Sequence, residues 1–75
     1  MIKFKAGEYY TPSTVPSINA LKCVKTTECF VWLYDEELEE EIKVKKNKGV
    51  HFNGKDLEEW EQVKVYGYLI RAIDN

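Results

Sequence analysis

Histidine, cysteine and glycine are scarce in this sequence, which excludes most catalytic and metal-binding sites. The 75 residues contain one histidine, two cysteines and four glycines, and the glycines are scattered instead of forming a phosphate-binding loop. A hydrolytic triad needs a nucleophile, a base and an orienting group, and a structural zinc ion needs four closely spaced ligands. We therefore expect no enzyme, no metal and no cofactor, and we expect His51 to be an outward polar residue of a short strand.

The two cysteines, Cys23 and Cys29, are too few for a disulfide framework. Their spacing leaves open a bond across a hairpin, but a reducing cytosol keeps such thiols free. Long apolar runs are also absent, since the longest one, residues 29–34, is far shorter than the roughly 18 residues of a membrane span. Residues 1–5 lack the apolar stretch of a signal peptide. We expect a soluble cytoplasmic protein without a membrane segment.

Aromatic and β-branched residues are plentiful, and they alternate with polar residues as they do in strands. The chain is 44% hydrophobic and 13% aromatic, which is sufficient for a compact core. The alternation predicts strands over residues 2–10, 18–25, 28–34, 42–46, 50–52 and 62–72.

Proline, glycine and charged residues mark the connections between these strands. They predict a loop over residues 11–17 and turns at 26–27, 35–41, 47–49 and 53–54. Residues 56–61 favour a short helical turn, because Asp56 can cap it while Leu57 and Trp60 share one face.

Two glycines interrupt predicted strands. Gly7 predicts a bend in the first strand. Gly67 predicts a bulge in the last strand, which would move its inward face to a different set of residues. The inward residues then change from Val63 and Val65 to Tyr68, Ile70 and Ala72.

The order of these elements predicts an all-β domain spanning residues 1–75, with five or six short antiparallel strands. A closed barrel suits such a chain, because closure removes unpaired strand edges. The strand order and the long loop after the first strand resemble an SH3-like barrel. The resemblance implies a small antiparallel barrel and covers most of the chain.

The strand at residues 28–34 has no charge on either face from Cys29 to Tyr34. One face holds the smaller side chains Cys29, Val31 and Leu33, which we expect inside the barrel, where space is short. The other face would then carry an outward aromatic stripe, which we define as Phe30, Trp32 and Tyr34. The helical turn at 56–61 or the N-terminal loop could cover it, whereas an uncovered stripe would mark a contact site.

Charge is segregated along the chain although its net value is only −2. Ten of the 13 acidic residues lie in 35–41 and 56–61, whereas residues 42–55 hold five lysines and no acid. Such segregation is ordinary on a solvated surface, but it also suits the electrostatic steering of a charged partner.

These surfaces favour a non-enzymatic protein-binding module whose partner is another protein or a second copy of the chain. We expect the aromatic stripe to provide affinity and charged loops to set orientation. The expected contact residues are Phe30, Trp32, Tyr34, Tyr66, Tyr68, Glu39, Glu40 and Glu41.

Two alternatives remain open. The acidic segments could imitate nucleic acid and inhibit a host or mobile-element enzyme. A barrel of the KOW or Tudor-like kind could instead bind nucleic acid, with His51, Phe52 or Tyr66 stacking on bases, although the net charge counts against it. The phosphate-binding residues would then be Lys43, Lys45, Lys46 and Lys48.

Overall fold

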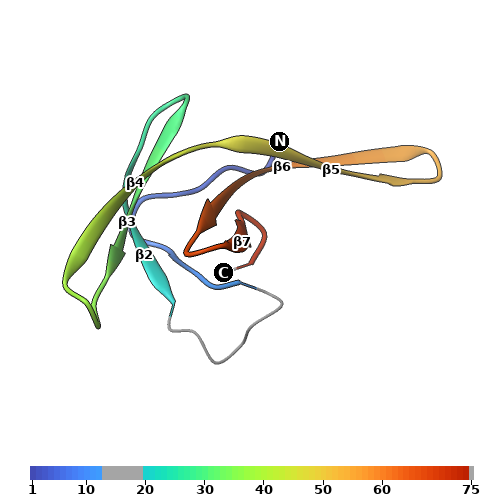
Figure 1. Ribbon diagram of the computed structural model, residues 1–75. Helices are drawn as coiled ribbons and strands as arrows, with labels where there is room; N and C mark the ends of the chain where they lie inside the picture. Colours follow the sequence, from blue (N-terminus) through green and yellow to red (C-terminus); the bar gives the residue numbers. More distant parts are fainter. Residues whose placement is uncertain (13–19, 75) are drawn as a thin grey trace.

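The computed structural model describes residues 1–12 and 20–74 (Figure 1). Within these residues the chain forms seven β-strands and no helix. The strands are β1 (Tyr9–Tyr10), β2 (Leu21–Thr26), β3 (Phe30–Asp35), β4 (Glu40–Lys45), β5 (Asn47–Asn53), β6 (Asp56–Val65) and β7 (Tyr68–Arg71). Most of the loop expected over 11–17, and the first residues of the strand expected over 18–25, lie outside the described residues.

The strands form two antiparallel sheets, which confirms the prediction of an antiparallel all-β fold. The N-terminal sheet has the order β1-β2-β3-β4, and the C-terminal sheet has the order β5-β6-β7. β4 leads into β5 with only Lys46 between them, so one stretch of backbone passes from the first sheet to the second. An isolated parallel bridge between Ile2 and Trp60 attaches the N-terminus to β6.

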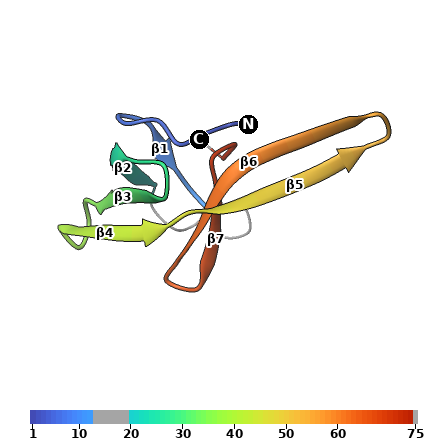
Figure 2. The same cartoon turned by 90° about the horizontal axis from the view of Figure 1, so that it is seen from above.

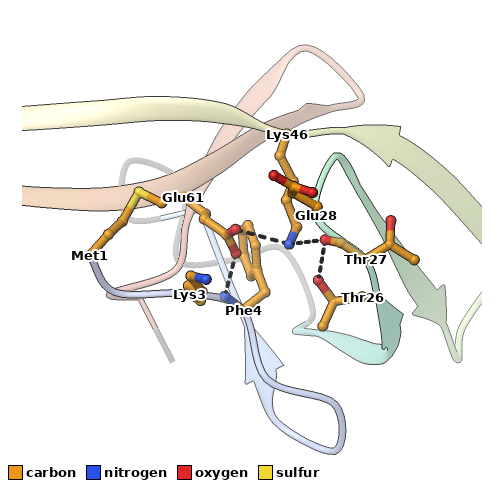
Figure 3. Close-up of a pocket in the computed structure, with 8 residues that line it drawn as sticks. All are labelled: Met1, Lys3, Phe4, Thr26, Thr27, Glu28, Lys46 and Glu61. Atoms are coloured by element: carbon orange, nitrogen blue, oxygen red, sulfur yellow. Dashed lines mark hydrogen bonds and ion pairs between the residues drawn. The ribbon is translucent and has the colours of Figure 1, made fainter.

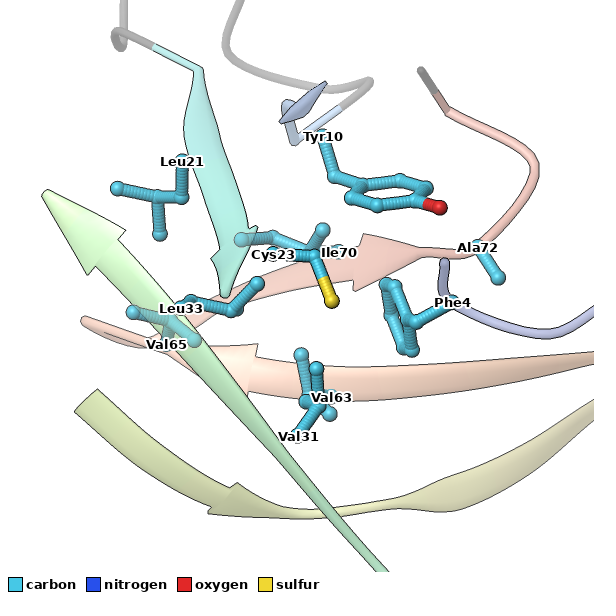
Figure 4. Close-up of a cluster of buried hydrophobic side chains, with 10 residues drawn as sticks. All are labelled: Phe4, Tyr10, Leu21, Cys23, Val31, Leu33, Val63, Val65, Ile70 and Ala72. Carbon is cyan, nitrogen blue, oxygen red and sulfur yellow. The ribbon is translucent and has the colours of Figure 1, made fainter. Parts of the chain in front are cut away.

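The hydrophobic core draws side chains from both sheets and from the N-terminal segment (Figure 4). Its buried members are Phe4, Tyr10, Leu21, Cys23, Val31, Leu33, Val63, Val65, Ile70 and Ala72. The rings of Phe4 and Tyr10 meet edge to face, with centroids 4.8 Å apart. The Tyr10 hydroxyl accepts a hydrogen bond from the Lys5 N–H, so the polar tip of this core residue is satisfied.

The inward face of β3 is the predicted one for two of its three residues. Val31 and Leu33 are fully buried, and the aromatic stripe points away from the core. Cys29 is exposed instead, because β3 begins one residue later, at Phe30. Cys23 is buried opposite Leu33, so the two free cysteines do not face each other across the hairpin.

The hairpin of β5 and β6 projects beyond the core, as Figures 1 and 2 both show. We call its outer part, residues 50–59, the arm. Every residue from Val50 to Glu58 is exposed, and the arm contributes to a longest molecular dimension of 43 Å. The two sheets are not closed into a barrel, which corrects the closed barrel expected from the sequence. The reason is that β5 and β6 pair with each other out to their turn, where the N-terminal sheet has no strand beside them.

The helical turn expected at 56–61 is wrong, because these residues form the first part of β6. Six residues make a marginal helix in water, whereas the hairpin offers register pairs from Asn47–Gln62 to Asn53–Asp56. The turn expected at 53–54 lies one residue later, at Gly54 and Lys55, because Asn53 still pairs with Asp56 as the last residue of β5. Gly54 has a φ of 66°, in the region that favours glycine.

The turn expected at 47–49 is also wrong, because these residues begin β5. The reason for Gly49 is packing: the Trp60 indole lies over it, and a Cβ there would be 2.5 Å from Trp60 Cε2. Glycine inside a strand often marks such a close approach.

The bulge expected at Gly67 is a hairpin turn. Tyr66 and Gly67 have φ values of 54° and 79°, the pair of positive values that a type I′ turn requires. The chain therefore reverses after Val65 instead of continuing as one strand. Tyr68 lies opposite Val65 and projects to the same side as Val65 and Ile70, as expected, but it is 37% exposed instead of buried.

The first expected strand, 2–10, is reduced to the bridge at Ile2 and the short β1. Gly7 bends the chain between them with a φ of 93°, as predicted. Its N–H donates to the Cys23 carbonyl, which ties the bend to β2.

Candidate binding face

The aromatic stripe lies in the middle of the solvent-facing side of the N-terminal sheet. Directly opposed residues of antiparallel strands project to the same side, so the register identifies the neighbours of the stripe. These neighbours are Lys22 and Lys25 on β2 and Glu41, Lys43 and Lys45 on β4. We call these five residues together with Phe30, Trp32 and Tyr34 the outer face.

Lysine ammonium groups lie over the rings of the stripe. Lys43 Nζ is 4.4 Å from the Phe30 ring centroid and 5.4 Å from that of Trp32. Lys25 Nζ approaches Trp32 from the other flanking strand at 4.9 Å. Each of these distances is within the roughly 6 Å over which a cation is attracted to an aromatic face. All three aromatic side chains are half-buried, so the lysines and the rings form one surface.

Lys22 and Lys25 are the functional candidates that sequence reasoning missed. Lys22 follows the alternation of β2 and lies opposite Tyr34. Lys25 does not follow the alternation of β2, because the register shifts between Cys23 and Lys25 and leaves Val24 as an extra, bulged residue. The alternation alone could have indicated Lys22, whereas only the pairing with β3 places Lys25 beside Trp32.

The Tyr34 end of the outer face has Lys22 on its β2 side and an acidic residue on its β4 side. Glu41 lies opposite Tyr34, and the Tyr9 hydroxyl donates a hydrogen bond of 2.8 Å to Glu36 Oε1. This hydrogen bond raises the pKa of Tyr9 above its ordinary value. Glu39 and Glu40, which were expected to orient a partner, are exposed near this end, so the outer face changes from basic to acidic along β4.

Tyr66 and Tyr68 were expected to join the contact surface of the aromatic stripe, but they lie elsewhere. Tyr66 lies in the β6–β7 turn, and its hydroxyl donates a hydrogen bond of 3.2 Å to Asp35 Oδ2. Asp35 is buried, on the core side of β3. Partial removal from water, followed by this hydrogen bond, raises the pKa of Tyr66. Tyr68 belongs to β7 of the C-terminal sheet.

The four lysines proposed for phosphate binding separate into different environments. Lys43 and Lys45 lie on the outer face, whereas Lys48 forms an exposed ion pair with Glu59. The side chain of Lys46 is buried, with Nζ 2.9 Å from Glu61 Oε2 and 2.6 Å from the Thr27 carbonyl oxygen (Figure 3). These four residues therefore do not form one basic site.

Lys46 and Glu61 are two of the eight residues that line a cavity of 540 Å³ (Figure 3). The other carboxylate oxygen of Glu61 accepts a hydrogen bond of 2.9 Å from the Phe4 N–H. The pair thus joins the N-terminal segment, the β2–β3 turn and β6. Both charged groups already have protein partners, which indicates a structural role.

The two acidic segments do not form one surface. Figures 1 and 2 both place the β3–β4 turn and the tip of the arm at opposite ends of the molecule. Asp35 and Glu61 are buried, and Glu59 pairs with Lys48. His51 and Phe52, expected near a nucleic acid, are exposed on the arm, away from the outer face.

No protein-family model, curated protein or solved structure matches this chain. In residues 1–12 and 20–74, no helix is long and apolar enough to span a membrane. Across the same residues, histidine, cysteine and acidic side chains do not gather in a group of three that could hold a metal ion. Any functional conclusion therefore depends on the surfaces themselves.

Proposed function

We propose that the protein is a non-enzymatic protein-binding module and that the outer face is its binding site. The observation that carries this proposal is the aromatic stripe with lysine ammonium groups over its rings. Aromatic residues are enriched among the residues that dominate binding energy at protein interfaces. Flanking lysines favour partners whose contact segment is acidic, because complementary charge accelerates and orients association.

The covered rings favour a protein partner over a nucleic acid. Proteins that bind single strands need aromatic faces on which bases stack, and Lys25 and Lys43 occupy the space above Phe30 and Trp32. An acidic protein segment can pair with these ammonium groups where they are and contact the edges of the rings.

Single-stranded nucleic acid is the second candidate. Lysines flank the stripe on both neighbouring strands, and this arrangement is also typical of surfaces that hold phosphates beside bases. Exposed cation–π contacts contribute only about 0.5–1 kcal/mol each, so a ligand could displace the lysines.

The experiment is affinity capture from a lysate of the source organism, using four immobilised proteins. Wild type is compared with the double variant Lys25→Glu/Lys43→Glu, with Trp32→Ala, and with Lys64→Glu, an exposed lysine of β6 that serves as the charge control. We expect the first two variants to lose at least about tenfold in capture, since they remove charge complementarity and the central ring. Lys64→Glu should capture as wild type does.

The chemical nature of the captured partner distinguishes the two candidates. A partner destroyed by protease and resistant to nuclease supports the protein-binding module. Direct binding of a labelled oligothymidylate, with quenching of Trp32 fluorescence and a steep loss with salt, would establish the second candidate instead. Equal capture by the wild type and by the Lys25→Glu/Lys43→Glu variant would contradict both. Circular dichroism checks folding, because unfolding of Trp32→Ala would mean that Trp32 acts in the core.

We also propose that the protein acts in the cytoplasm, because Cys23 and Cys29 are free thiols and the cytosol keeps thiols reduced. The resemblance of the strand order to that of an SH3-like barrel remains a prediction, and the binding proposal does not depend on it.

A further inference from the structure

β5 is an open sheet edge. It is the terminal strand in the order β5-β6-β7, so within the described part of the chain its seven residues pair on one side only. Exposed edges are usually protected by bulges, prolines or several charges, because they otherwise pair with another strand. The register of β5 with β6 has no bulge, and the strand contains no proline and a single lysine, Lys48.

One side of the arm near this edge is apolar and exposed. Val50 and Phe52 project to the same side of β5, and Leu57 lies opposite Phe52 on β6. The exposed fractions of Val50, Phe52 and Leu57 are 57%, 69% and 55%. An apolar group of this kind on a projecting hairpin is typical of a contact with another chain.

We propose that two copies of the chain join through this edge, with β5 of each copy antiparallel to the other and a two-fold axis at Val50. This register pairs all seven residues of β5. Val50 of one copy faces Val50 of the other, and Lys48 of one copy faces Phe52 of the other. The two arms then form one four-stranded sheet in the order β6-β5-β5-β6.

The distribution of charge favours pairing between two copies of the chain in this register. Around Val50 no charged residue of β5 faces a like charge, and Lys48 meets an aromatic ring, which attracts cations. His51 of one copy faces Gly49 of the other, where the Trp60 indole covers the strand. An axis at His51 would instead oppose two histidines, and one at Lys48 would oppose two lysines.

This interface goes beyond the proposed binding function, because it uses the C-terminal sheet and leaves the outer face free. A two-fold edge contact is self-complementary, so it closes at a dimer. The protein would then present two outer faces, one on each copy.

Cysteine cross-linking tests the register directly. In a Cys29→Ser background, Val50→Cys should form a disulfide-linked dimer on mild oxidation, because the two introduced thiols lie opposite each other. Asn53→Cys alone should not link, since each copy of residue 53 faces residue 47. A mixture of Asn53→Cys and Asn47→Cys proteins should link. Cross-linking of Val50→Cys no faster than that of Asn53→Cys alone would overturn the proposal.

The solution mass supplies an independent measurement. Wild type should change from 8.8 kDa to twice that mass as its concentration rises. Val50→Lys should remain monomeric, because it opposes two lysines at the axis, whereas Val24→Lys, at another exposed valine, should dimerise normally. A wild type that is monomeric at every concentration, or a dimer abolished by Trp32→Ala and unaffected by Val50→Lys, would contradict the edge interface. Because the proposed partner capture depends on the outer face, loss of the dimer leaves that proposal standing.

Discussion

At the scale of single residues, two ion pairs with the same separation differ in their surroundings. Lys46–Glu61 and Lys48–Glu59 each have a nitrogen–oxygen distance of 2.9 Å. The side chains of the first pair are 7% exposed, whereas those of the second are 55% and 29% exposed. Water screens the second pair, whereas little of the first pair is in contact with water, so their contributions to stability differ although their separations are the same.

Replacing each lysine by methionine measures this difference. Lys46→Met leaves the Glu61 carboxylate buried without its counter-ion, so we expect the free energy of unfolding to fall by about 3 kcal/mol or more. Lys48→Met should change it by less than about 1 kcal/mol, as is usual for exposed pairs. Urea unfolding followed by tryptophan fluorescence gives both values, and equal losses would show that burial does not set the contribution of the Lys46 pair.

The sequence predicts part of the binding face at this scale. The difference in size between the two faces of β3 indicates that Val31 and Leu33 are inward and the aromatic stripe outward. The alternation places Lys43 outward and Lys46 on the side of Ile42 and Val44. It does not reveal the partner of Lys46, a carboxylate supplied 15 residues away by β6. For the same reason, the role of Lys25 follows from the bulge at Val24 and not from its position in the sequence.

At the scale of elements, the β3–β4 turn depends on one buried carboxylate within an acidic segment. Asp35 Oδ1 accepts hydrogen bonds from the N–H groups of Glu37 and Leu38, at 3.0 and 3.2 Å, and Oδ2 accepts one from Tyr66. The turn expected at 35–41 is confirmed for Glu36 to Glu39 only, because Asp35 is the buried end of β3 and the last two residues begin β4. Asp35 thus links the turn of the N-terminal sheet to the turn between β6 and β7.

Substitutions within the segment should therefore have unequal effects. Asp35→Ala removes the acceptor of three hydrogen bonds, and we expect the free energy of unfolding to fall by about 1–3 kcal/mol. The triple variant Glu39→Gln/Glu40→Gln/Glu41→Gln should change it by less than about 0.5 kcal/mol, because these side chains are exposed. Urea denaturation of both proteins measures this contrast, and a large loss in the triple variant would mean that these glutamates are paired in the fold.

Turn signals predict the connections only where local geometry determines them. Gly54 lies in a turn because glycine adopts a positive φ there without strain. Gly49 also follows an asparagine and a lysine and so resembles a turn glycine, but glycine is needed there because the Trp60 ring from the neighbouring strand lies against it. Residues 56–61 were assigned to a helix because Leu57 and Trp60 are three apart, whereas pairing with β5 decides their conformation.

At the scale of the whole molecule, one core holds both sheets together, and two of its members can ionise at high pH. Cys23 and Tyr10 are buried among the core residues. Burial raises the pKa of the Cys23 thiol and that of the Tyr10 hydroxyl above their ordinary values. Folding therefore favours the neutral forms, whereas the unfolded chain releases both protons more readily.

Stability should consequently fall in alkali. The contribution of these groups is fully present below pH 9 and is lost as the pH rises through their raised folded values. We expect the midpoint of urea unfolding to be lower at about pH 10.5 than at about pH 8, and part of this loss to be absent in Tyr10→Phe. An identical alkaline loss in Tyr10→Phe and wild type would show that Tyr10 is not a source of the effect.

The junction at Lys46 has a consequence for which changes of chain length the protein tolerates. Side chains alternate along β4 and β5, so deleting one residue at this junction would turn every side chain of β5 to the opposite side of the sheet. Val50 and Phe52 would exchange sides with His51, and Gly49 would move from beneath Trp60. Insertions should be accepted at the tips, around Gly54–Lys55 and Glu36–Glu39, where exposed turn backbone can lengthen without altering a register. Natural variation in length should therefore gather at the two ends of the molecule, and the stretch from Lys43 to Val50 should keep a constant length.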